Sequence, residues 1–263
     1  KKYHVEIRYQ CAVKQLLIRD DRVRGVVTKQ GETLEAGRVI VATGGLSYEA
    51  TGSTGDGYLF AKQAGHTVTG LKPALVPFHI REEWCKQLMG LSLKNVSLLL
   101  TDGKREYFNG FGEMLFTHFG ISGPLVLTAS SYYEKYGLEN KGMLYLDLKP
   151  ALTEEQLDRR LLREIEAGHH KQFVNGLGSL FPSRLIPVMV ALSGISPAKR
   201  MYEITREERK AFGELIKHIP LHITGTRSFK EAIITQGGVS VKEINPSTME
   251  SRKIKGLYFA GEV

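Results

Sequence analysis

The feature that most constrains the fold is a change of secondary-structure pattern along the chain, followed by a return to the first pattern. Residues 1–75 and 232–263 contain short apolar runs that end in glycine-rich turns, as in the strands of α/β sheets. Residues 76–150 and 219–231 have mainly strand patterns, and residues 151–218 have helical spacing. A single domain rarely changes class and then returns. We therefore expect an α/β domain interrupted by a β-rich insert, which in turn carries a helical subdomain.

The first α/β part begins with a predicted β-meander within residues 1–42. Its strands are expected at Val5–Tyr9, Ala12–Ile18 and Val23–Thr28, because apolar residues alternate or cluster there and turn residues separate the runs. The short apolar run Val39–Ala42 is typical of a strand that is covered on both faces.

The insert is predicted to begin as antiparallel β structure and then to become helical. Asp102-Gly103 is a tight-turn dipeptide that follows the strand-like run Val96–Thr101. Two helices are expected to start at capping boxes, which occur at Thr153–Gln156 and Thr205–Glu208. Strands are expected to resume from about residue 219.

Composition places the chain among ordinary globular proteins. Of its 263 residues, 42% are hydrophobic and 24% are charged, which excludes a disordered chain and a disulfide-stapled miniprotein. No apolar run approaches the roughly 20 residues that span a bilayer, and no leader-like start is present. The two cysteines, Cys11 and Cys85, lack metal-binding spacing. We therefore expect a cytoplasmic protein with no metal site and no membrane segment.

The net charge of +8 raises the question of nucleic-acid binding. Basic residues are interleaved with acidic ones, as in Arg159–Glu164 and Arg206–Lys210, which is typical of solvated helix faces with local charge pairs. A phosphate-binding stripe would concentrate positive charge instead. We therefore expect a small-molecule substrate and do not expect nucleic acid as a partner. The oligomeric state stays open.

Two glycine-rich segments are candidates for a ligand site. Thr43-Gly44-Gly45 follows the run Val39–Ala42, and glycines there let a ligand approach the backbone at the carboxyl end of a strand. Thr54-Gly55-Asp56 precedes a predicted helix over residues 58–65 and offers N–H groups, a hydroxyl and a carboxylate to a phosphate or ribose. The alternative is a plain connection capped by Asp56. The standard phosphate loops GxGxxG and GxxxxGK[ST] do not occur.

A third segment lies at the end of the chain. The apolar run Gly256–Ala260 leads into Gly261 and Glu262, where a carboxylate could accept hydrogen bonds from sugar hydroxyls. A Gly-Glu turn after a strand is common, so this segment carries weight only together with the others.

Together these segments resemble known FAD fingerprints. Residues 39–45 and 256–262 look like the Ala-Thr-Gly and terminal Gly-Asp motifs of glutathione-reductase-type flavoproteins, with Glu262 in place of the usual Asp. Over nearly the whole chain, five ordered motifs are similar to the bacterial flavoprotein family of aminoacetone oxidase and the BaiN-type bile-acid reductases, the HI0933-like family. These motifs are Ala42–Tyr48, Thr51–Gly57, Gly112–Pro124, Thr235–Val239 and Gly256–Glu262.

The resemblance implies an FAD-dependent oxidoreductase, either an NAD(P)H-linked reductase or an amine oxidase. Its fold would be a glutathione-reductase-type FAD domain with a β-barrel-like insert that carries a helical subdomain. In that family an N-terminal unit with GxGxxG holds the FAD pyrophosphate, and a segment after the Gly-Glu motif covers the flavin; this sequence has neither. We interpret the chain as a fragment that is inactive by itself and binds FAD poorly. Stoichiometric FAD retained by the chain would contradict this interpretation.

By position, the resemblance assigns residues to the parts of FAD. The adenine would be bordered by Ala12 and Val13, and the pyrophosphate side by Thr43, Gly44 and Gly45. The ribityl and phosphate would lie at Gly261 and Glu262, and the strand leading to the flavin would contain Gln236, Gly237 and Gly238. The candidate polar cradle before the helix consists of Thr54, Gly55 and Asp56.

His118 is the one histidine inside a family motif. It could act as an acid or base toward the flavin or a substrate, although a structural role in this glycine- and proline-rich loop is the more common alternative. The sequence identifies no other catalytic residue. Two other functions stay open: a module that docks protein or RNA through the inserts, and an FAD-dependent RNA-modifying enzyme, because some tRNA-modifying flavoproteins share the FAD fold.

Overall fold

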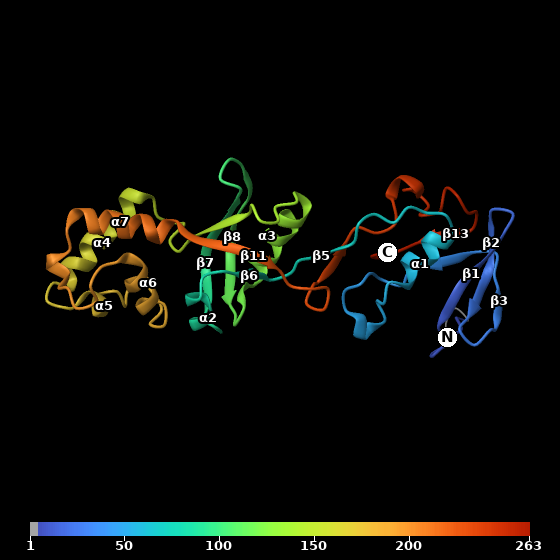
Figure 1. Cartoon of the computed structure of the whole chain (residues 1–263), viewed down its shortest axis with the longest axis horizontal. Helices are drawn as coiled ribbons and strands as arrows, with labels where there is room; N and C mark the ends of the chain where they lie inside the picture. Colours follow the sequence, from blue (N-terminus) through green and yellow to red (C-terminus); the bar gives the residue numbers. More distant parts are fainter. Residues whose placement is uncertain (1–4) are drawn as a thin grey trace. The chain divides into compact units, whose positions relative to one another are not determined.

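The computed structural model describes residues 5–263, which form two compact units. One unit consists of the described residues up to 74 together with residues 228–263, and the other consists of residues 75–227. The chain therefore leaves the first unit once, builds the second and returns (Figure 1). The predicted boundaries of three parts, including a separate helical subdomain over residues 151–218, stay predictions.

A three-stranded antiparallel sheet begins the first unit. It consists of β1 (Val13–Arg19), β2 (Arg22–Thr28) and β3 (Thr33–Glu35), in that order. Asp20 and Asp21 both have positive φ and form the tight turn between β1 and β2. The predicted strands at Ala12–Ile18 and Val23–Thr28 are thereby confirmed.

The predicted strand at Val5–Tyr9 is wrong. This segment is irregular, and the side chains of Val5, Ile7 and Tyr9 are exposed. Alternation alone does not make a strand, because the backbone N–H and C=O groups must also find a partner. This segment has no partner strand within the described residues. The meander prediction also covered residues 1–4, which lie outside the described residues.

Two short sheets and one helix complete the regular structure of the first unit. β4 (Val39–Val41) pairs in parallel with β13 (Leu257–Phe259), and β5 (Lys72–Ala74) pairs antiparallel with β12 (Ile234–Gln236). Helix α1 (Asp56–Gln63) confirms the predicted helix. Two 3-10 turns are η1 (Glu49–Thr51) and η3 (Val241–Glu243).

The first unit has a small core between α1 and the strands. Leu16, Val23, Phe60, Leu257 and Phe259 are all buried in it. Gln63, the last residue of α1, fixes the helix to β1: its Oε1 accepts from Leu16 N–H (2.9 Å) and its Nε2 donates to Leu16 C=O (3.0 Å).

β4 is not covered on both faces, contrary to the prediction from its continuous apolar run. Val41 is buried, but the side chain of Ile40 is 67% exposed. Nothing in the described residues covers the face of the β4–β13 sheet on which Ile40 lies. A continuous apolar run is typical of strands in parallel sheets whose two faces are both covered. In this sheet the core covers the face with Val41, and the face with Ile40 is exposed.

Six strands of the second unit form a closed barrel in which every pairing is antiparallel. Around the barrel the order is β10-β11-β6-β9-β8-β7, so each strand has two neighbours and none is left as an edge. The strands are β6 (Phe78–Ile80), β7 (Ser92–Thr101), β8 (Glu106–Phe116), β9 (Gly120–Ser122), β10 (Met143–Asp147) and β11 (Ile219–Thr226). The barrel confirms the predicted antiparallel insert, with Asp102-Gly103 as the β7–β8 turn.

Two helices of the barrel region are not predicted by the sequence pattern. α2 (Trp84–Gln87) is short, and α3 (Pro124–Lys135) packs against β8. The α3 sequence contains Val126, Thr128, Tyr132 and Tyr133, which are residue types that favour strands, so its local pattern is misleading. Its position is decided by packing: a Cβ at Gly110 of β8 would lie 2.9 Å from Leu125 Cδ1 of α3. Glycine at 110 therefore permits the close approach of the helix.

Between β10 and β11 the chain is helical. It forms α4 (Glu154–Ala167), α5 (Phe173–Gly176), α6 (Ile186–Ser193), a 3-10 turn η2 (Met201–Glu203) and α7 (Arg206–Lys217). Both predicted capping boxes are present, because Thr153 accepts from Gln156 N–H and Thr205 from Glu208 N–H. These helices lie together at one end of the barrel (Figure 1). Their core is continuous with that of the barrel.

Candidate functional site

The carboxyl ends of β4 and β13 lie side by side in the first unit. The parallel register pairs Val39 with Leu257 and Val41 with Phe259, and Ala260 N–H donates to Val41 C=O (3.0 Å). Thr43-Gly44-Gly45 and Gly261-Glu262, which lie more than two hundred residues apart in the sequence, therefore leave the same edge of one sheet. In open α/β sheets this edge is where ligands bind.

The segment that contains β12 and the predicted residues Gln236, Gly237 and Gly238 contacts the residues that follow β4 and β13. Thr235 Oγ1 accepts from Leu46 N–H (2.8 Å) and lies 3.2 Å from Ser47 Oγ. Val239 N–H donates to Val263 C=O (3.4 Å), just beyond Gln236, Gly237 and Gly238. The structure therefore brings together residues 43–47, 235–239 and 260–263.

The glycines of this region have two different roles. A Cβ at Gly45 would lie 2.5 Å from Thr235 Oγ1 and 2.9 Å from Tyr58 OH, and a Cβ at Gly44 would clash with Ser53 Oγ. A side chain at either position would therefore meet other residues of the unit, which gives both glycines a packing role. Their assignment to the pyrophosphate side of FAD stays a prediction. Gly261 is different, because it has φ +80° and a Cβ there would meet nothing within 4 Å. It leaves open space at the end of β13.

Thr43 has the one buried side-chain polar atom of the described residues that lacks a hydrogen-bond partner, Oγ1. A buried polar atom without a hydrogen bond destabilises the folded state, unless a group outside these residues forms a hydrogen bond with it. It is positioned just after β4, beside the backbone of Gly57 in α1. The hydroxyl fits a group with a hydrogen-bonding oxygen, as a nucleotide cofactor has.

The predicted cradle Thr54-Gly55-Asp56 lies at the beginning of α1. Gly55 is the N-cap, with φ +84°, and Asp56 is the first helical residue. No side chain caps this helix, so the structure does not bear out the capping role of Asp56 that was the alternative interpretation. An uncapped N-terminus leaves N–H groups with partial positive charge, which favours an anion such as phosphate.

Ala12 and Val13, predicted to border the adenine, lie at the start of β1. Val13 pairs with Thr28, and Ala12 C=O accepts from Lys29 N–H (2.8 Å). They therefore belong to the three-stranded sheet and not to the β4–β13 pair. Their assignment to FAD stays a prediction.

His118 belongs to the second unit, in the exposed turn before β9. Its ring contacts Phe119 edge-to-face at 4.9 Å between centroids. Phe119 also contacts His79 at 5.4 Å, and the Arg227 guanidinium lies 4.4 Å above its ring. Sequence reasoning missed His79 and Arg227, because neither lies in a recognised motif and only the pairing of β6, β9 and β11 brings them beside Phe119.

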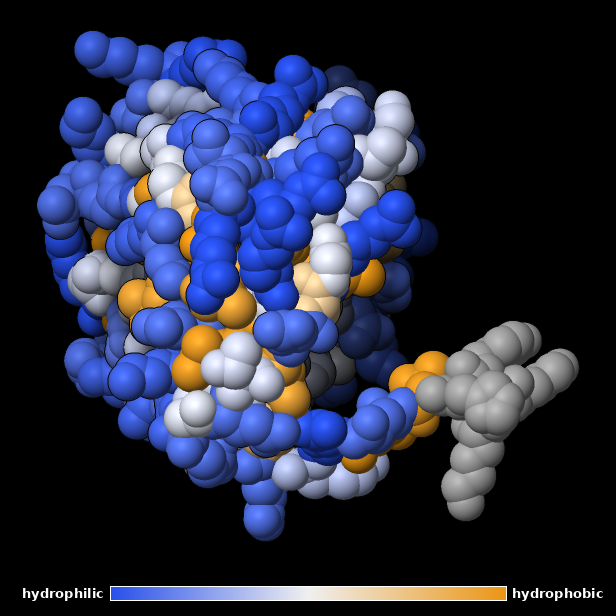
Figure 2. All heavy atoms as spheres, turned by 90° about the vertical axis from the view of Figure 1, so that its right-hand side faces the viewer, coloured by the Kyte–Doolittle hydropathy of each residue, from blue (hydrophilic) through white to orange (hydrophobic). Residues whose placement is uncertain are grey.

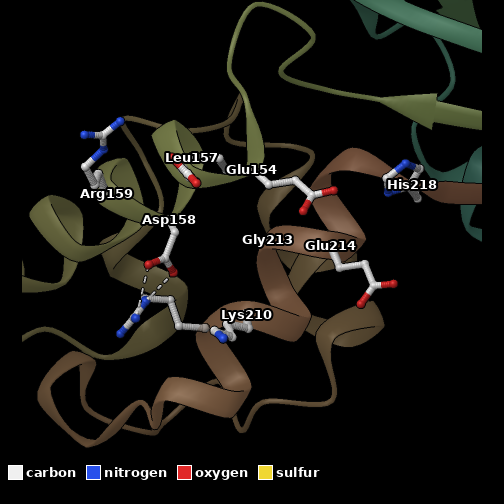
Figure 3. Close-up of a pocket in the computed structure, with 10 residues that line it drawn as sticks. Glu154, Leu157, Asp158, Arg159, Lys210, Gly213, Glu214 and His218 are labelled. Atoms are coloured by element: carbon white, nitrogen blue, oxygen red, sulfur yellow. Dashed lines mark hydrogen bonds and ion pairs between the residues drawn. The ribbon is translucent and has the colours of Figure 1, made fainter.

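A cleft of about 720 Å³ lies between α4 and α7 of the second unit and contains none of the predicted site residues (Figure 3). Carboxylates and cations are mixed in its lining, and Arg209 Nε donates to Asp158 Oδ1 at 2.7 Å. Figure 3 shows Glu154 of α4 and Glu214 of α7 on its two sides. This mixed lining selects neither anions nor cations.

A buried histidine in the first unit has contacts that resemble a hydrolase triad. His66 Nδ1 lies 3.1 Å from Glu243 Oε2, and His66 Nε2 lies 2.7 Å from Ser251 Oγ. Ser251 Oγ also accepts from the N–H groups of Lys253 (3.0 Å) and Ile254 (2.8 Å). A serine oxygen that already accepts two hydrogen bonds is a poor nucleophile, so the network is structural and fixes the turn before β13 to the end of α1.

The surface of the first unit is mainly hydrophilic on the face shown in Figure 2, with a smaller group of hydrophobic side chains. No helix among residues 5–263 has the length and apolar character required to cross a bilayer.

A family model described as "HI0933-like protein barrel and H2TH domain" matches residues 72–234, which is more than half of the chain. The matched residues include the barrel and the helices between β10 and β11. The chain belongs to the HI0933-like family. The resemblance indicated by the five motifs is therefore confirmed.

Three curated proteins are similar to this HI0933-like chain over most of its length. A ribosomal RNA dihydrouridine synthase of Haemophilus influenzae is 33% identical, over 100% of the chain and 63% of its own length. A protein of the same name from Escherichia coli is 30% identical, over 98% of the chain and 62% of its own length. A 3-dehydro-bile acid delta(4,6)-reductase of Clostridium scindens is 31% identical, over 90% of the chain and 58% of its own length. The chain thus spans about three fifths of these relatives.

These names change the balance between the functions that the sequence left open. Two of the three relatives are named for ribosomal RNA, which weighs against the expectation that nucleic acid is not a partner. None of the three carries an amine-oxidase name. The comparisons favour the RNA-modifying alternative over the small-molecule interpretation.

Proposed function

We propose that the full-length protein is an FAD-dependent oxidoreductase that reduces a uridine in RNA to dihydrouridine. The reaction adds a hydride and a proton across the carbon–carbon double bond of the uracil ring, and NAD(P)H is oxidised to NAD(P)⁺. RNA is chosen as the substrate because two relatives with this name match at least 98% of the chain.

The observation that carries the cofactor part of the proposal is the unpartnered Thr43 Oγ1 at the paired ends of β4 and β13. Thr43 would hydrogen-bond an oxygen of the cofactor, Gly261 would leave room for it, and the uncapped start of α1 would attract its phosphate charge. FAD, when bound, would supply the hydride-transfer chemistry.

The residues of this chain would position the cofactor and exclude water at one side of it. Glu262 leaves the end of β13 with an exposed side chain, as a group that binds sugar hydroxyls requires. Its backbone C=O lies 3.5 Å from Tyr58 OH, which helps to fix this end of the chain. His118 stays the candidate for the proton donor, because its imidazole is exposed and an imidazole can serve as a general acid or base.

The test uses full-length protein, which we expect to be yellow and to release FAD on denaturation. It is incubated with an unmodified ribosomal RNA transcript and either NADPH or NADH. Mass spectrometry of the digested RNA should then show a uridine that has gained two hydrogens. RNA of unchanged mass, with the flavin reduced by the nicotinamide, would contradict the RNA part of the proposal.

A Thr43→Val variant tests the cofactor part. Removal of the hydroxyl should weaken FAD binding about five- to tenfold, as expected for the loss of one buried hydrogen bond. Thr33→Val is the matched control, because Thr33 is exposed on β3. Equal FAD retention by both variants would show that Thr43 does not bind the cofactor.

A second candidate is the reduction of a carbon–carbon double bond in a steroid-like small molecule. The bile-acid reductase that is 31% identical over 90% of the chain supports it. It predicts that a 3-oxo steroid with conjugated double bonds oxidises the reduced flavin faster than RNA does.

A further inference from the structure

Helix α3 lies against β8 (Figure 1). Four aromatic side chains of this region form a continuous series of ring contacts. Tyr107 and Phe108 come from β8, Tyr132 comes from α3, and Tyr136 is the C-cap residue that follows α3. Ring centroids lie 5.2 Å apart for Tyr107–Tyr136 and for Phe108–Tyr132, and 6.4 Å apart for the stacked pair Tyr132–Tyr136. We call these four residues the aromatic strip.

Tyr132 and Tyr136 form the exposed half of the strip, whereas Tyr107 and Phe108 are half-buried and pack against the hydrophobic core of the second unit. Tyr132 is 36% exposed and Tyr136 is 42% exposed, whereas Tyr133 between them is buried against Phe78. The spacing of four residues places Tyr132, in the last turn of α3, and the C-cap residue Tyr136 on the same side of the helix end. Aromatic rings held in place yet left accessible offer flat faces to a ligand at little entropic cost.

Two cations lie over rings of the strip. The Lys135 ammonium is 5.2 Å from the Tyr136 centroid, and the Arg105 guanidinium is 5.7 Å from that of Tyr107. Asp102 lies in the same segment, where it accepts from the N–H groups of Lys104 (2.9 Å) and Arg105 (2.8 Å), and from Tyr107 OH (2.9 Å). Glu106 is the exposed carboxylate of this segment. Neither Arg105 nor Lys135 forms an ion pair with a carboxylate of the described residues, so both cations are available to an anionic ligand.

Rings with adjacent cations suit a ligand that has flat aromatic groups joined by negative charges. Unpaired nucleotides have this chemistry, since bases stack on aromatic rings and phosphates pair with Lys and Arg. The bases of a duplex are stacked on one another and present no free face. The ligand is therefore a single strand.

We propose that the aromatic strip binds an unpaired segment of RNA, with bases stacked on Tyr132 and Tyr136 and phosphates near Arg105 and Lys135. This inference rests on the proposed function, because it takes RNA as the substrate. It adds a site for the RNA on the barrel, in the unit that contains none of the predicted FAD-binding residues.

The test measures binding of a fluorescent 12-nucleotide oligouridine to the full chain by anisotropy. In Tyr132→Ala/Tyr136→Ala we expect the Kd to rise at least tenfold, since each stacked base contributes about 1–3 kcal/mol, which is about 5- to 150-fold. In Arg105→Gln/Lys135→Gln the slope of log Kd against log salt should fall by about 1.4. Tyr202→Ala is the matched control, because Tyr202 is a 51% exposed tyrosine of the same unit that stacks on His169.

Each outcome decides the inference. The inference is supported if the strip variants lose oligouridine binding while their thermal unfolding is unchanged and Tyr202→Ala still binds oligouridine. Equal binding by the double tyrosine variant, or a larger loss in Tyr202→Ala, overturns it, and so does a preference for duplex RNA. RNA reduction by the full-length protein is measured separately. Reduction with no effect of the strip variants on binding refutes the strip alone, whereas absence of reduction refutes the proposed function.

Discussion

The two units of this chain complete their backbone pairing to different extents. In the second unit each of six strands has two neighbours, and one hydrophobic core extends from the barrel into the helices. In the first unit the sheets have two or three strands, Ile40 is exposed and Thr43 Oγ1 has no partner. The barrel strands therefore find all their strand partners within their own unit. In the first unit, an apolar side chain is exposed and a buried hydroxyl lacks a hydrogen-bond partner among the described residues, beside the motifs that resemble FAD fingerprints.

The largest expected effect comes from a cavity in the barrel. Phe116 is 1% exposed and packs against Trp84, so Phe116→Ala should lower the free energy of unfolding by about 3–5 kcal/mol. Ile40→Ala should change it by less than about 0.5 kcal/mol, because the side chain is exposed. Urea denaturation followed by circular dichroism measures both. Similar losses in the two variants would contradict the contrast between the units.

A substitution at Gly45 tests whether the first unit is well packed where its motifs meet. In Gly45→Ala the new methyl group would lie 2.5 Å from Thr235 Oγ1, so we expect a loss of about 1–3 kcal/mol. Gly37→Ala is the control, since a Cβ there meets nothing within 4 Å. An unchanged unfolding midpoint for Gly45→Ala would mean that this glycine keeps space for a ligand after all.

Helix capping should have a smaller effect. Thr153 and Thr205 are the N-caps of α4 and α7, and each accepts a backbone N–H at 3.2 Å. Replacement of either by Ala should cost about 1 kcal/mol, while replacement by Ser should preserve most of the stability. Thermal unfolding of the four single variants measures this. A Thr→Ala variant as stable as its Ser counterpart would refute the capping role.

The smallest effect is a pH dependence in the first unit. Glu243 accepts hydrogen bonds from Lys253 and Thr67. These hydrogen bonds hold the pKa of the Glu243 carboxyl at about 2, below its usual 4.5. The stabilisation is therefore present above pH 4.5 and is lost as the pH falls toward 2. Burial lowers the pKa of His66 from 6.5, so proton uptake by the unfolded chain also reduces stability as the pH falls below about 6.5.

The variant for this prediction is Lys253→Gln, which should raise the pKa of Glu243 and flatten the loss of stability below pH 4.5. Lys62→Gln is the control, because Lys62 is exposed on α1. Unfolding midpoints are measured between pH 3 and pH 8. Identical profiles for the two variants would show that Lys253 does not set the charge state of Glu243.

Prediction from the sequence worked where a few adjacent residues decide the structure. The capping boxes at Thr153 and Thr205 and the Asp102-Gly103 turn were confirmed, because each depends on hydrogen bonds within four residues. Prediction failed at Val5–Tyr9 and for α3 (Pro124–Lys135). Both outcomes depend on partners that are distant in the sequence: a neighbour strand that residues 5–263 do not supply in one case, and the β8 surface in the other.

The candidate site shows the same division. The motifs around Thr43 and Gly261 could be found in the sequence, but their juxtaposition depends on the parallel pairing of β4 with β13. The packing role of Gly45 could not be predicted, because Thr235 is far from it along the chain.

The sequence by itself determined the order of structural classes, the local turns and caps, and the family. The tertiary structure decided that the barrel closes, that the ends of β4 and β13 meet beside Thr43 Oγ1, and that four aromatic rings gather on α3 and β8. The physical reason is that turns and caps are stabilised by interactions within a few residues. Strand pairing and packing depend on which distant segment supplies the missing hydrogen bonds and apolar contacts.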